Sequence, residues 1–222
     1  MTSVKISENI QAFLWLDPST NNANTYFINR KKKILIDPGH FAVFGHVRDH
    51  LQRLSLTPED VDLVIITHVH PDHMEALRVF TDASTLNALS AIEMAYMKEL
   101  APQYAASMGL TDFQPQLLLK EGELVVDDMA FQVILTPGHS PGSLCLYWPE
   151  IKALFSGDVV FNQGIGRVDL PGGDGEALKQ SIEKLNRLDV EYLLPGHGDV
   201  VSGRDRVKAN FDTIRNLWFG YI

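Results

Sequence analysis

A segment of seven residues, 67–73, concentrates metal-binding side chains directly after the apolar run of residues 61–66. It reads Thr-His-Val-His-Pro-Asp-His. In a helix, His68 and His70 would point about 200° apart, and Pro71 would interrupt the turn. A strand that ends in a tight loop would instead let the three imidazoles and the one carboxylate surround a single point. Placing these groups together without a cation is costly, so we expect a metal site here.

The second half of the chain offers three further candidate ligands. Each follows a short apolar run and comes directly after a glycine, which lets the backbone turn sharply and approach other groups closely. They are His139, Asp158 and His197. A single residue of this kind would be an ordinary loop residue, but together the three complement the donors of the first segment.

Short strands and helices must deliver these residues. In the first half we predict an antiparallel meander, a helix over 44–54, a turn that begins with Thr57 as N-cap and Pro58, a strand over 62–66 and a short helix over 74–80. In the second half we predict strands over 123–126, 130–135, 143–148, 152–155 and 192–194, with helices over 176–188 and 204–218. Strands and helices intermixed in two halves favour stacked layers with the helices outside.

The segment between the halves is expected to be a longer helix over 86–100. Apolar residues at steps of three and four form a core-facing stripe, which comprises Leu89, Ile92, Tyr96 and Leu100. A second stripe comprises Met94, Met97, Tyr104 and Met108. The second stripe could be a lid over the site, a homodimer surface or a further part of the core, and these three alternatives stay open.

Composition limits the class of protein. A chain of 222 residues with 45% hydrophobic residues suits one domain, and 28 acidic against 19 basic residues give a formal charge of -9. The basic run at 30–33 is interpreted as a solvated hairpin turn, so no nucleic-acid partner is expected. Residues 1–10 lack the apolar stretch typical of a leader, and no run of about 18 apolar residues occurs in the sequence. With one cysteine, Cys145, a cytoplasmic location is expected. Cys145 alternates within a predicted strand and is interpreted as buried rather than nucleophilic.

The ordered set of motifs resembles the metallo-β-lactamase superfamily over nearly the whole chain. Within it, the run at 164–174, Gly-Ile-Gly-Arg-Val-Asp-Leu-Pro-Gly-Gly-Asp, is similar to the glyoxalase II-like (hydroxyacylglutathione hydrolase-like) enzymes. The resemblance implies an α/β fold, a four-layer αββα sandwich, as a single domain over 1–222 with a helical insert at about 84–110. It also implies a ligand set. His68, His70 and His139 would hold one metal ion, Asp72, His73 and His197 would hold a second, and Asp158 would bridge them.

The chemistry of this donor set agrees with the resemblance. Two divalent ions would share a water whose pKa falls toward neutrality, and the resulting hydroxide would attack a carbonyl polarised by the same ions. Zinc is the first expectation, and iron or manganese would suit the same ligands. Asp72 is either a ligand only or also a catalytic group that orients the hydroxide.

The function expected is a binuclear hydrolase that cleaves a thioester, ester or lactone in a small acyl substrate, with the use of glutathione left open. The alternative is a mononuclear-iron persulfide dioxygenase of the same superfamily.

Several supporting residues carry weaker signals. Asp37, at a predicted strand end, either orients a ligand histidine or only forms a turn. Arg167 and Asp169 form either an ion pair within a loop or a contact to a substrate carboxylate. Met74 follows the metal motif where many family members have a small residue, which suggests a bulkier floor of the site. The three histidines outside the motifs, His40, His46 and His50, are assigned to surface or helix positions.

Overall fold

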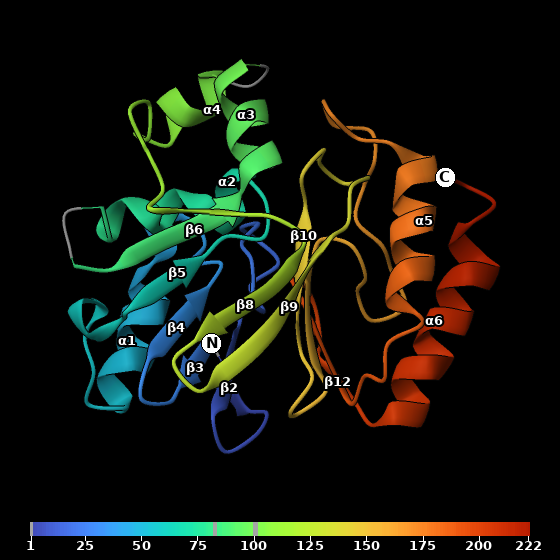
Figure 1. Ribbon diagram of the computed structural model, residues 1–222, viewed down its shortest axis with the longest axis horizontal. Helices are drawn as coiled ribbons and strands as arrows, with labels where there is room; N and C mark the ends of the chain where they lie inside the picture. The colour runs from blue at the N-terminus through green and yellow to red at the C-terminus, as the bar shows by residue number, and fades with distance from the viewer. Residues whose placement is uncertain (1, 82–83, 100–101) are drawn as a thin grey trace. The chain divides into compact units, whose positions relative to one another are not determined.

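The computed structural model describes residues 2–81, 84–99 and 102–222. The chain divides into two compact units, Met1–Leu119 and Lys120–Ile222. Each unit is built on one β-sheet (Figure 1).

The sheet of the first unit has seven strands in chain order. They are β1 (Thr2–Lys5), β2 (Ile10–Leu14), β3 (Thr25–Asn29), β4 (Lys33–Ile36), β5 (Leu63–Ile65), β6 (Leu86–Ser90) and β7 (Leu117–Leu119). Strands β1 to β4 form an antiparallel meander, and β4 to β7 run parallel. The meander was predicted from β2 onward. Because carboxyl ends of parallel strands share one sheet edge, the segment after β5 lies beside the segment after β6.

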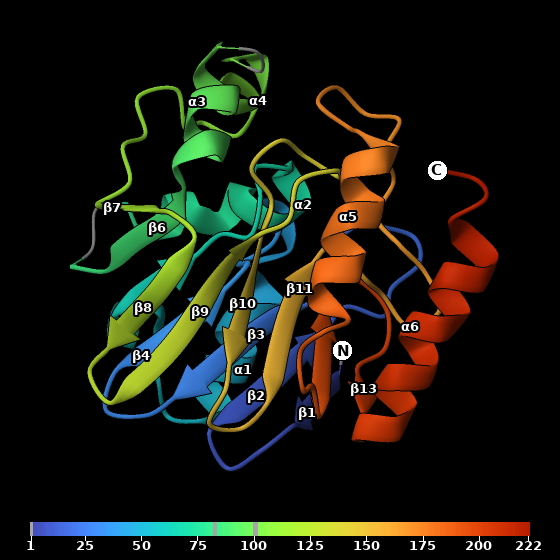
Figure 2. The same ribbon diagram turned by 45° about the vertical axis from the view of Figure 1, so that its right-hand side comes forward.

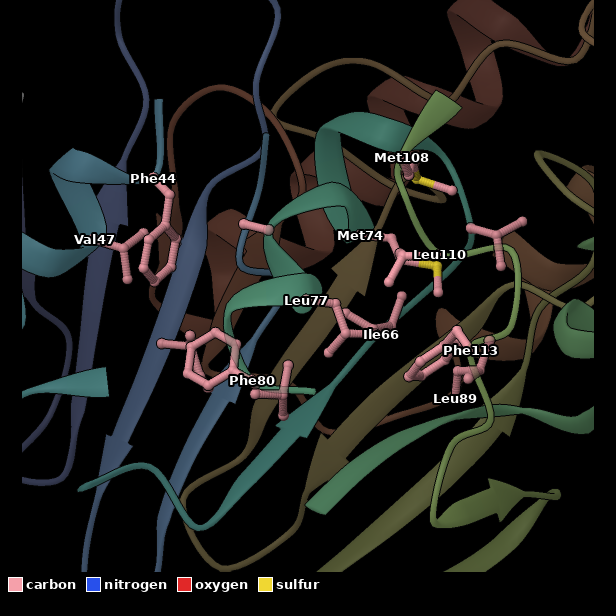
Figure 3. Packing of buried hydrophobic residues seen from close by; sticks show 14 of the residues in the cluster. Phe44, Val47, Ile66, Met74, Leu77, Phe80, Leu89, Met108, Leu110 and Phe113 are labelled. Carbon is pink, nitrogen blue, oxygen red and sulfur yellow. The ribbon is translucent and has the colours of Figure 1, made fainter. Parts of the chain in front are cut away.

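Helices of this unit pack on the sheet through a buried apolar cluster. They are α1 (Gly45–Arg53), α2 (Pro71–Met74), α3 (Ala91–Glu99) and α4 (Pro102–Ser107), with 3-10 turns at Phe41–Val43, Pro58–Asp60 and Glu75–Val79. The rings of Phe44 and Phe80 meet edge to face, with 5.8 Å between their centroids. Ile66, directly after β5, belongs to the same cluster (Figure 3). The predicted Thr57 cap is confirmed, since Thr57 and Asp60 form a reciprocal capping box.

The predicted helix over 86–100 is wrong in its first turn and a half. Leu86–Ser90 is strand β6, which pairs parallel with β5, and the helix begins at Ala91. A short apolar run fits a buried parallel strand as well as a helix, and pairing with β5 decides between them. The end of the predicted helix, Leu100, lies outside the described residues.

The expected core stripe on this segment is also wrong in part. Ile92 is 45% exposed, whereas Met94, Met97 and Met108 are almost fully buried in the apolar cluster (Figure 3 labels Met108). Starting the helix at 91 rather than 86 removes Leu89 from the helical stripe. The buried methionines favour the core alternative. The side chain of Tyr104 lies outside the described residues.

The metal motif is also not wholly a loop. Residues up to His70 are extended or turn, but Pro71 is the first residue of the short helix α2, with Asp72 and His73 in that turn. Pro71 therefore starts a helix rather than preventing one, because proline at the first helical position loses no hydrogen bond.

The sheet of the second unit has six strands in the order β13-β12-β11-β10-β9-β8. They are β8 (Gly122–Val126), β9 (Met129–Leu135), β10 (Leu144–Trp148), β11 (Ala153–Gly157), β12 (Tyr192–Pro195) and β13 (Val201–Ser202). All pairs are antiparallel except β11 with β12. The five predicted strands of this half are confirmed within two residues, and β13 was not predicted.

Two helices, α5 (Gly175–Leu185) and α6 (Arg204–Trp218), lie side by side against this sheet (Figure 2). Both were predicted. Leu178 and Ile182 of α5 and Phe211 of α6 bury their side chains in one cluster with strand residues. An exposed ion pair between Arg215 and Glu183 at 2.9 Å also links the two helices.

Three smaller expectations are tested by the structure. Cys145 is fully buried in β10, and burial raises the pKa of its thiol to about 12, so the interpretation as a buried residue holds. Residues 30–32 form the turn between β3 and β4, where Lys32 pairs with Asp62 at 2.7 Å. Among the described helices, we find none with the length and hydropathy needed to cross a bilayer.

Candidate metal centre

Four candidate ligands of the first unit lie together beyond the end of β5. The ring centroids of His68 and His70 are 4.7 Å apart, and those of His68 and His73 are 4.0 Å apart. A carboxylate oxygen of Asp72 and a ring nitrogen of His73 lie within 4.8 Å of each other. Ring nitrogens of the pairs named above also lie within this distance. All four residues are buried. Strand β5 and the first turn of α2 therefore bring together the whole set that the sequence motif predicted.

The carboxylate of Asp37, which follows β4, orients this cluster through hydrogen bonds to Thr67 and His73. Its Oδ2 accepts hydrogen bonds from the Thr67 hydroxyl at 2.7 Å and from His73 Nδ1 at 2.9 Å, and its Oδ1 accepts from the Thr67 backbone N–H at 2.8 Å. The Asp37 backbone is held by Ile65 O and the Thr25 hydroxyl. The predicted orienting role of Asp37 thus matches its contacts.

These contacts set the tautomers of two imidazoles. The carboxylate of Asp37 can only accept, so Nδ1 of His73 carries the proton and the ring lone pair lies on Nε2. The hydroxyl proton of Thr67 goes to Asp37, so Thr67 Oγ1 accepts from Nδ1 of His68, 3.1 Å away. Both rings therefore present Nε2 as the basic nitrogen, which is the form that binds a metal ion.

Asp72 is oriented by a residue far away in the sequence. Nδ2 of Asn21 donates to Asp72 Oδ2 at 2.6 Å, and the Ala23 backbone N–H donates to the Asp72 carbonyl at 3.1 Å. Asn21 is exposed, whereas Asp72 is 8% exposed. The carboxylate thus lies at the boundary between the buried cluster and solvent.

The second unit brings its three candidate ligands together around one oxygen. Oδ2 of Asp158, which follows β11, lies 3.5 Å from Nε2 of His139 and 3.3 Å from Nε2 of His197. Nδ1 of His139 donates to the backbone carbonyl of Arg167 at 2.7 Å, which again places the basic nitrogen at Nε2. A carboxylate flanked by the Nε2 atoms of two imidazoles is a ligand arrangement suited to cations.

The glycine-rich segment after Asp158 packs directly on these ligands. A Cβ on Gly166 would lie 1.8 Å from the Asp158 carbonyl oxygen and 3.2 Å from Cγ of His139. A glycine is therefore required at 166 for the segment to approach so closely. The next residue, Arg167, supplies the carbonyl that accepts from His139.

The Arg167 side chain forms the predicted loop ion pair. It contacts both oxygens of Asp169 at 2.8 and 2.7 Å, and these hydrogen bonds lower the pKa of Asp169 to about 2. Both side chains are exposed. Of the two alternatives, the structure therefore contains the ion pair between Arg167 and Asp169 within the loop.

Residues outside the motifs occupy other places. His46 and His50 are buried on α1, and His40 pairs with Glu75 at 2.8 Å. Met74, the expected bulkier floor of the site, directly follows His73. Its side chain is fully buried in the apolar cluster beside Leu77 and Leu110 (Figure 3).

Two residues of the site were missed from the sequence. Asn21 lies in an asparagine-rich stretch before β3, and neither Asn21 nor Glu93 was predicted to belong to the site. Glu93 is fully buried on α3, where its Oε2 accepts from the backbone N–H of Val69 at 2.9 Å. The only local signal for Asn21 was a cluster of asparagines directly before a strand, which is common in ordinary turns.

The donor set suits divalent metal ions. It consists of imidazole nitrogens and carboxylate oxygens without thiolate, which fits zinc, iron or manganese. The second ring nitrogens of His68, His73 and His139 have oxygen partners that orient them, as the histidine ligands of metal sites have.

Comparisons with known proteins agree with this geometry. A family model for the metallo-beta-lactamase superfamily matches residues 19–197. A probable metallo-hydrolase of Methanocaldococcus jannaschii, MJ0888, is 32% identical over 81% of this chain and 89% of its own. The hydroxyacylglutathione hydrolase GloC of Haemophilus influenzae is 29% identical over 85% of this chain and 91% of its own.

Solved structures give the same answer for the fold. The B3 metallo-beta-lactamase BLEG-1 matches with a TM-score of 0.73 and 30% identity over 93% of this chain and 96% of that one. TTHA1623 in a di-iron-bound form matches with a TM-score of 0.66 and 32% identity over 84% of this chain and 92% of that one. The predicted fold class is confirmed. The chain belongs to the metallo-beta-lactamase superfamily and carries the histidine and aspartate groups of a metal-dependent hydrolase.

Proposed function

We propose that this chain is a binuclear metal-dependent hydrolase that cleaves a thioester, ester or lactone. In this proposal the seven candidate ligands form one centre for two ions. His68, His70 and His139 hold one ion, Asp72, His73 and His197 hold the other, and Asp158 bridges them. The observation that carries the proposal is the position of Asp158 Oδ2, within 3.5 Å of Nε2 of both His139 and His197, which are assigned to different ions.

The chemistry follows from the ligand types. Two bound divalent ions would lower the pKa of a shared water toward neutrality and polarise the substrate carbonyl. Asp72 serves as ligand and as acceptor for the proton of the attacking water, which orients the water toward the carbonyl carbon. Asn21 holds the Asp72 carboxylate in the required rotamer through its 2.6 Å hydrogen bond. The water oxygen adds to the carbonyl carbon, the C–S or C–O bond of the substrate breaks, and the proton accepted by Asp72 passes to the departing thiolate or alkoxide. The products are a carboxylic acid and a thiol or alcohol.

Relatives support a hydrolase and leave the acyl group open. One relative bears the name hydroxyacylglutathione hydrolase, so a glutathione thioester is the first substrate to test. A solved relative holds two irons, so zinc and iron are both candidates and zinc remains our first choice.

The test combines metal analysis with anaerobic assays. Protein purified without added metal, then fully loaded, should hold two ions per chain and cleave members of a panel of acyl thioesters, esters and lactones without oxygen. Asp158→Ala should lose at least one ion and nearly all activity, whereas Asp212→Ala, an exposed change on α6, should match the wild type. One ion per fully loaded chain would contradict the proposal, as would oxygen consumption with glutathione persulfide and no anaerobic cleavage.

A further inference from the structure

A buried carboxylate outside the metal motif contacts the backbone between two ligand histidines. Glu93 lies in the first turn of α3 and has no exposed surface. Fully buried glutamates are rare unless their charge has a partner. Its Oε2 accepts the backbone N–H of Val69 at 2.9 Å, and Val69 is the single residue between His68 and His70.

Strand pairing explains why this helix reaches the metal motif. Ile65 of β5 is in register with Ala88 of β6, and Ile66 N–H continues the ladder by donating to Ala88 O at 2.9 Å. Helix α3 starts directly after β6, so its first turn stands beside the segment that follows β5. A carboxylate in the first turn of a helix is also stabilised in its charged form by the helix dipole.

The hydrogen bond has a consequence for the two ligands beside it. The Val69 peptide is fully buried, so its N–H must find an acceptor within the protein. Holding this peptide plane fixes the direction in which the chain leaves His68 and enters His70. The spacing of these two imidazoles therefore depends on Glu93.

The other two ligands of the first unit have separate anchors. His73 is held by Asp37, and Asp72 is held by Asn21. Asp37 reaches both ligand pairs, because it also holds Thr67, the partner of the His68 ring. Glu93 differs in that it holds the backbone between His68 and His70.

We infer that Glu93 is a positioning residue that sets the affinity of the His68 and His70 site selectively, through its hydrogen bond to Val69. This inference rests on the proposed binuclear centre. It concerns the chain's own support for one of the two ions rather than the reaction itself.

The experiment titrates metal-free protein with Co²⁺ and follows both heat and visible absorption. Glu93→Ala should weaken one of two binding steps by roughly 10- to 100-fold and leave the other near its wild-type value, as loss of an outer hydrogen bond does at other metal sites. Glu99→Ala, an exposed glutamate on the same helix, is the matched control and should titrate like the wild type.

Two further variants separate the hydrogen bond from the charge and keep the test available if Glu93→Ala does not fold. Glu93→Gln keeps the length and an acceptor oxygen, so it should restore affinity to within a few-fold of the wild type and keep the Val69 amide protected from hydrogen exchange. Glu93→Asp keeps the charge but is one methylene shorter, so it should bind weakly and expose that amide.

Three results would overturn the inference: equal weakening of both steps, unchanged affinity in Glu93→Ala and Glu93→Asp, or an aspartate variant that binds better than the glutamine variant. A wild type that binds only one Co²⁺ would contradict the binuclear proposal instead. The ranking of the Glu93 variants by Co²⁺ affinity at that one site would still test the role of Glu93.

Discussion

Oδ2 of Asp37 lies 2.9 Å from Nδ1 of His73, and both side chains are almost completely buried. Asp37 adopts a left-handed backbone conformation with φ of 52°. Such a conformation is uncommon for a residue other than glycine, although aspartate and asparagine tolerate it best. The sharp turn after β4 therefore delivers a carboxylate to the back of a ligand histidine, and backbone strain at this point is part of how the site is built.

Replacing Asp37 by Asn should therefore weaken metal binding. Asparagine tolerates the backbone conformation, but its amide would place a donor where Oδ2 now accepts from both Thr67 and His73. We expect about a 10- to 100-fold loss of affinity at the site that contains His73, and a loss of about 1–3 kcal/mol in the free energy of unfolding. Calorimetric titration and urea denaturation measure the two quantities.

Asp127→Asn is the matched control for this change. Asp127 also has a left-handed backbone, with φ of 55°, but it is exposed in the turn between β8 and β9. The metal affinity and the free energy of unfolding of the Asp127→Asn variant should equal those of the wild type. An equal loss in both variants would show that the backbone conformation, and not the contact with His73, causes the effect.

Asn21→Ala tests the orientation of Asp72. Asn21 is exposed, so the free energy of unfolding should change by less than about 0.5 kcal/mol. The Asp72 carboxylate would lose its 2.6 Å donor, and kcat should fall by roughly tenfold, in line with the loss of an outer hydrogen bond at a metal site. Steady-state kinetics checks this, with the exposed Asn29→Ala on β3 as the control. An unchanged kcat would remove Asn21 from the site.

Strand ends were the most predictable part of this protein. Asp158 directly follows the fully buried strand β11, and one glycine separates His197 from the end of β12 at Pro195. Apolar runs of this length specify buried strands, and glycine marks the turn that presents the next side chain. These are local signals, so they can be found without knowledge of which strands pair.

Non-local contacts account for what was not predicted. Strand β6 was mistaken for a helix because only its pairing with β5 distinguishes the two. Glu93 and Glu99 are two glutamates on the same helix, yet one is fully buried and the other exposed. Val69, whose N–H donates to Glu93, lies 24 positions earlier, so no pattern within the helix identifies this contact.

Met97→Ala tests whether the methionines of α3 belong to the core. Met97 is 1% exposed within the apolar cluster, so its truncation should cost about 2–5 kcal/mol. Ile92→Ala on the same helix removes a side chain that is 45% exposed and should cost far less. Urea denaturation compares the two. If Met97→Ala changes substrate preference without a loss of stability, the lid alternative returns.

Two buried histidines on α1 should make the stability depend on pH. Burial is the main cause that lowers the pKa of both His46 and His50 below 6.5. The unfolded chain then binds protons at a higher pH than the folded chain, so the free energy of unfolding is fully present above about pH 6.5 and falls as the pH drops toward the folded pKa values. Urea denaturation of metal-free protein from pH 8 to pH 5 should show this fall.

A single substitution isolates the contribution of one histidine. His50 stacks on Phe13 with 4.7 Å between ring centroids, so His50→Phe keeps an aromatic ring in place and removes the titrating group. Its free energy of unfolding should fall less steeply below pH 6.5 than that of the wild type. Identical slopes in the two proteins would contradict the assignment.

Gly166→Ala tests whether the segment after Asp158 supports the ligands. The added Cβ would overlap the Asp158 carbonyl oxygen, 1.8 Å away, so the segment must shift away from Asp158 and His139. We expect a cost of about 1–3 kcal/mol in the free energy of unfolding. Metal affinity should also weaken, because the Arg167 carbonyl that orients His139 moves with the segment. Gly164→Ala is the matched control, since its Cβ would meet only the Phe161 side chain at 3.6 Å. Urea denaturation and metal titration measure the free energy of unfolding and the metal affinity of both variants. Equal values for the two variants would mean that close packing at Gly166 does not hold the ligands in place.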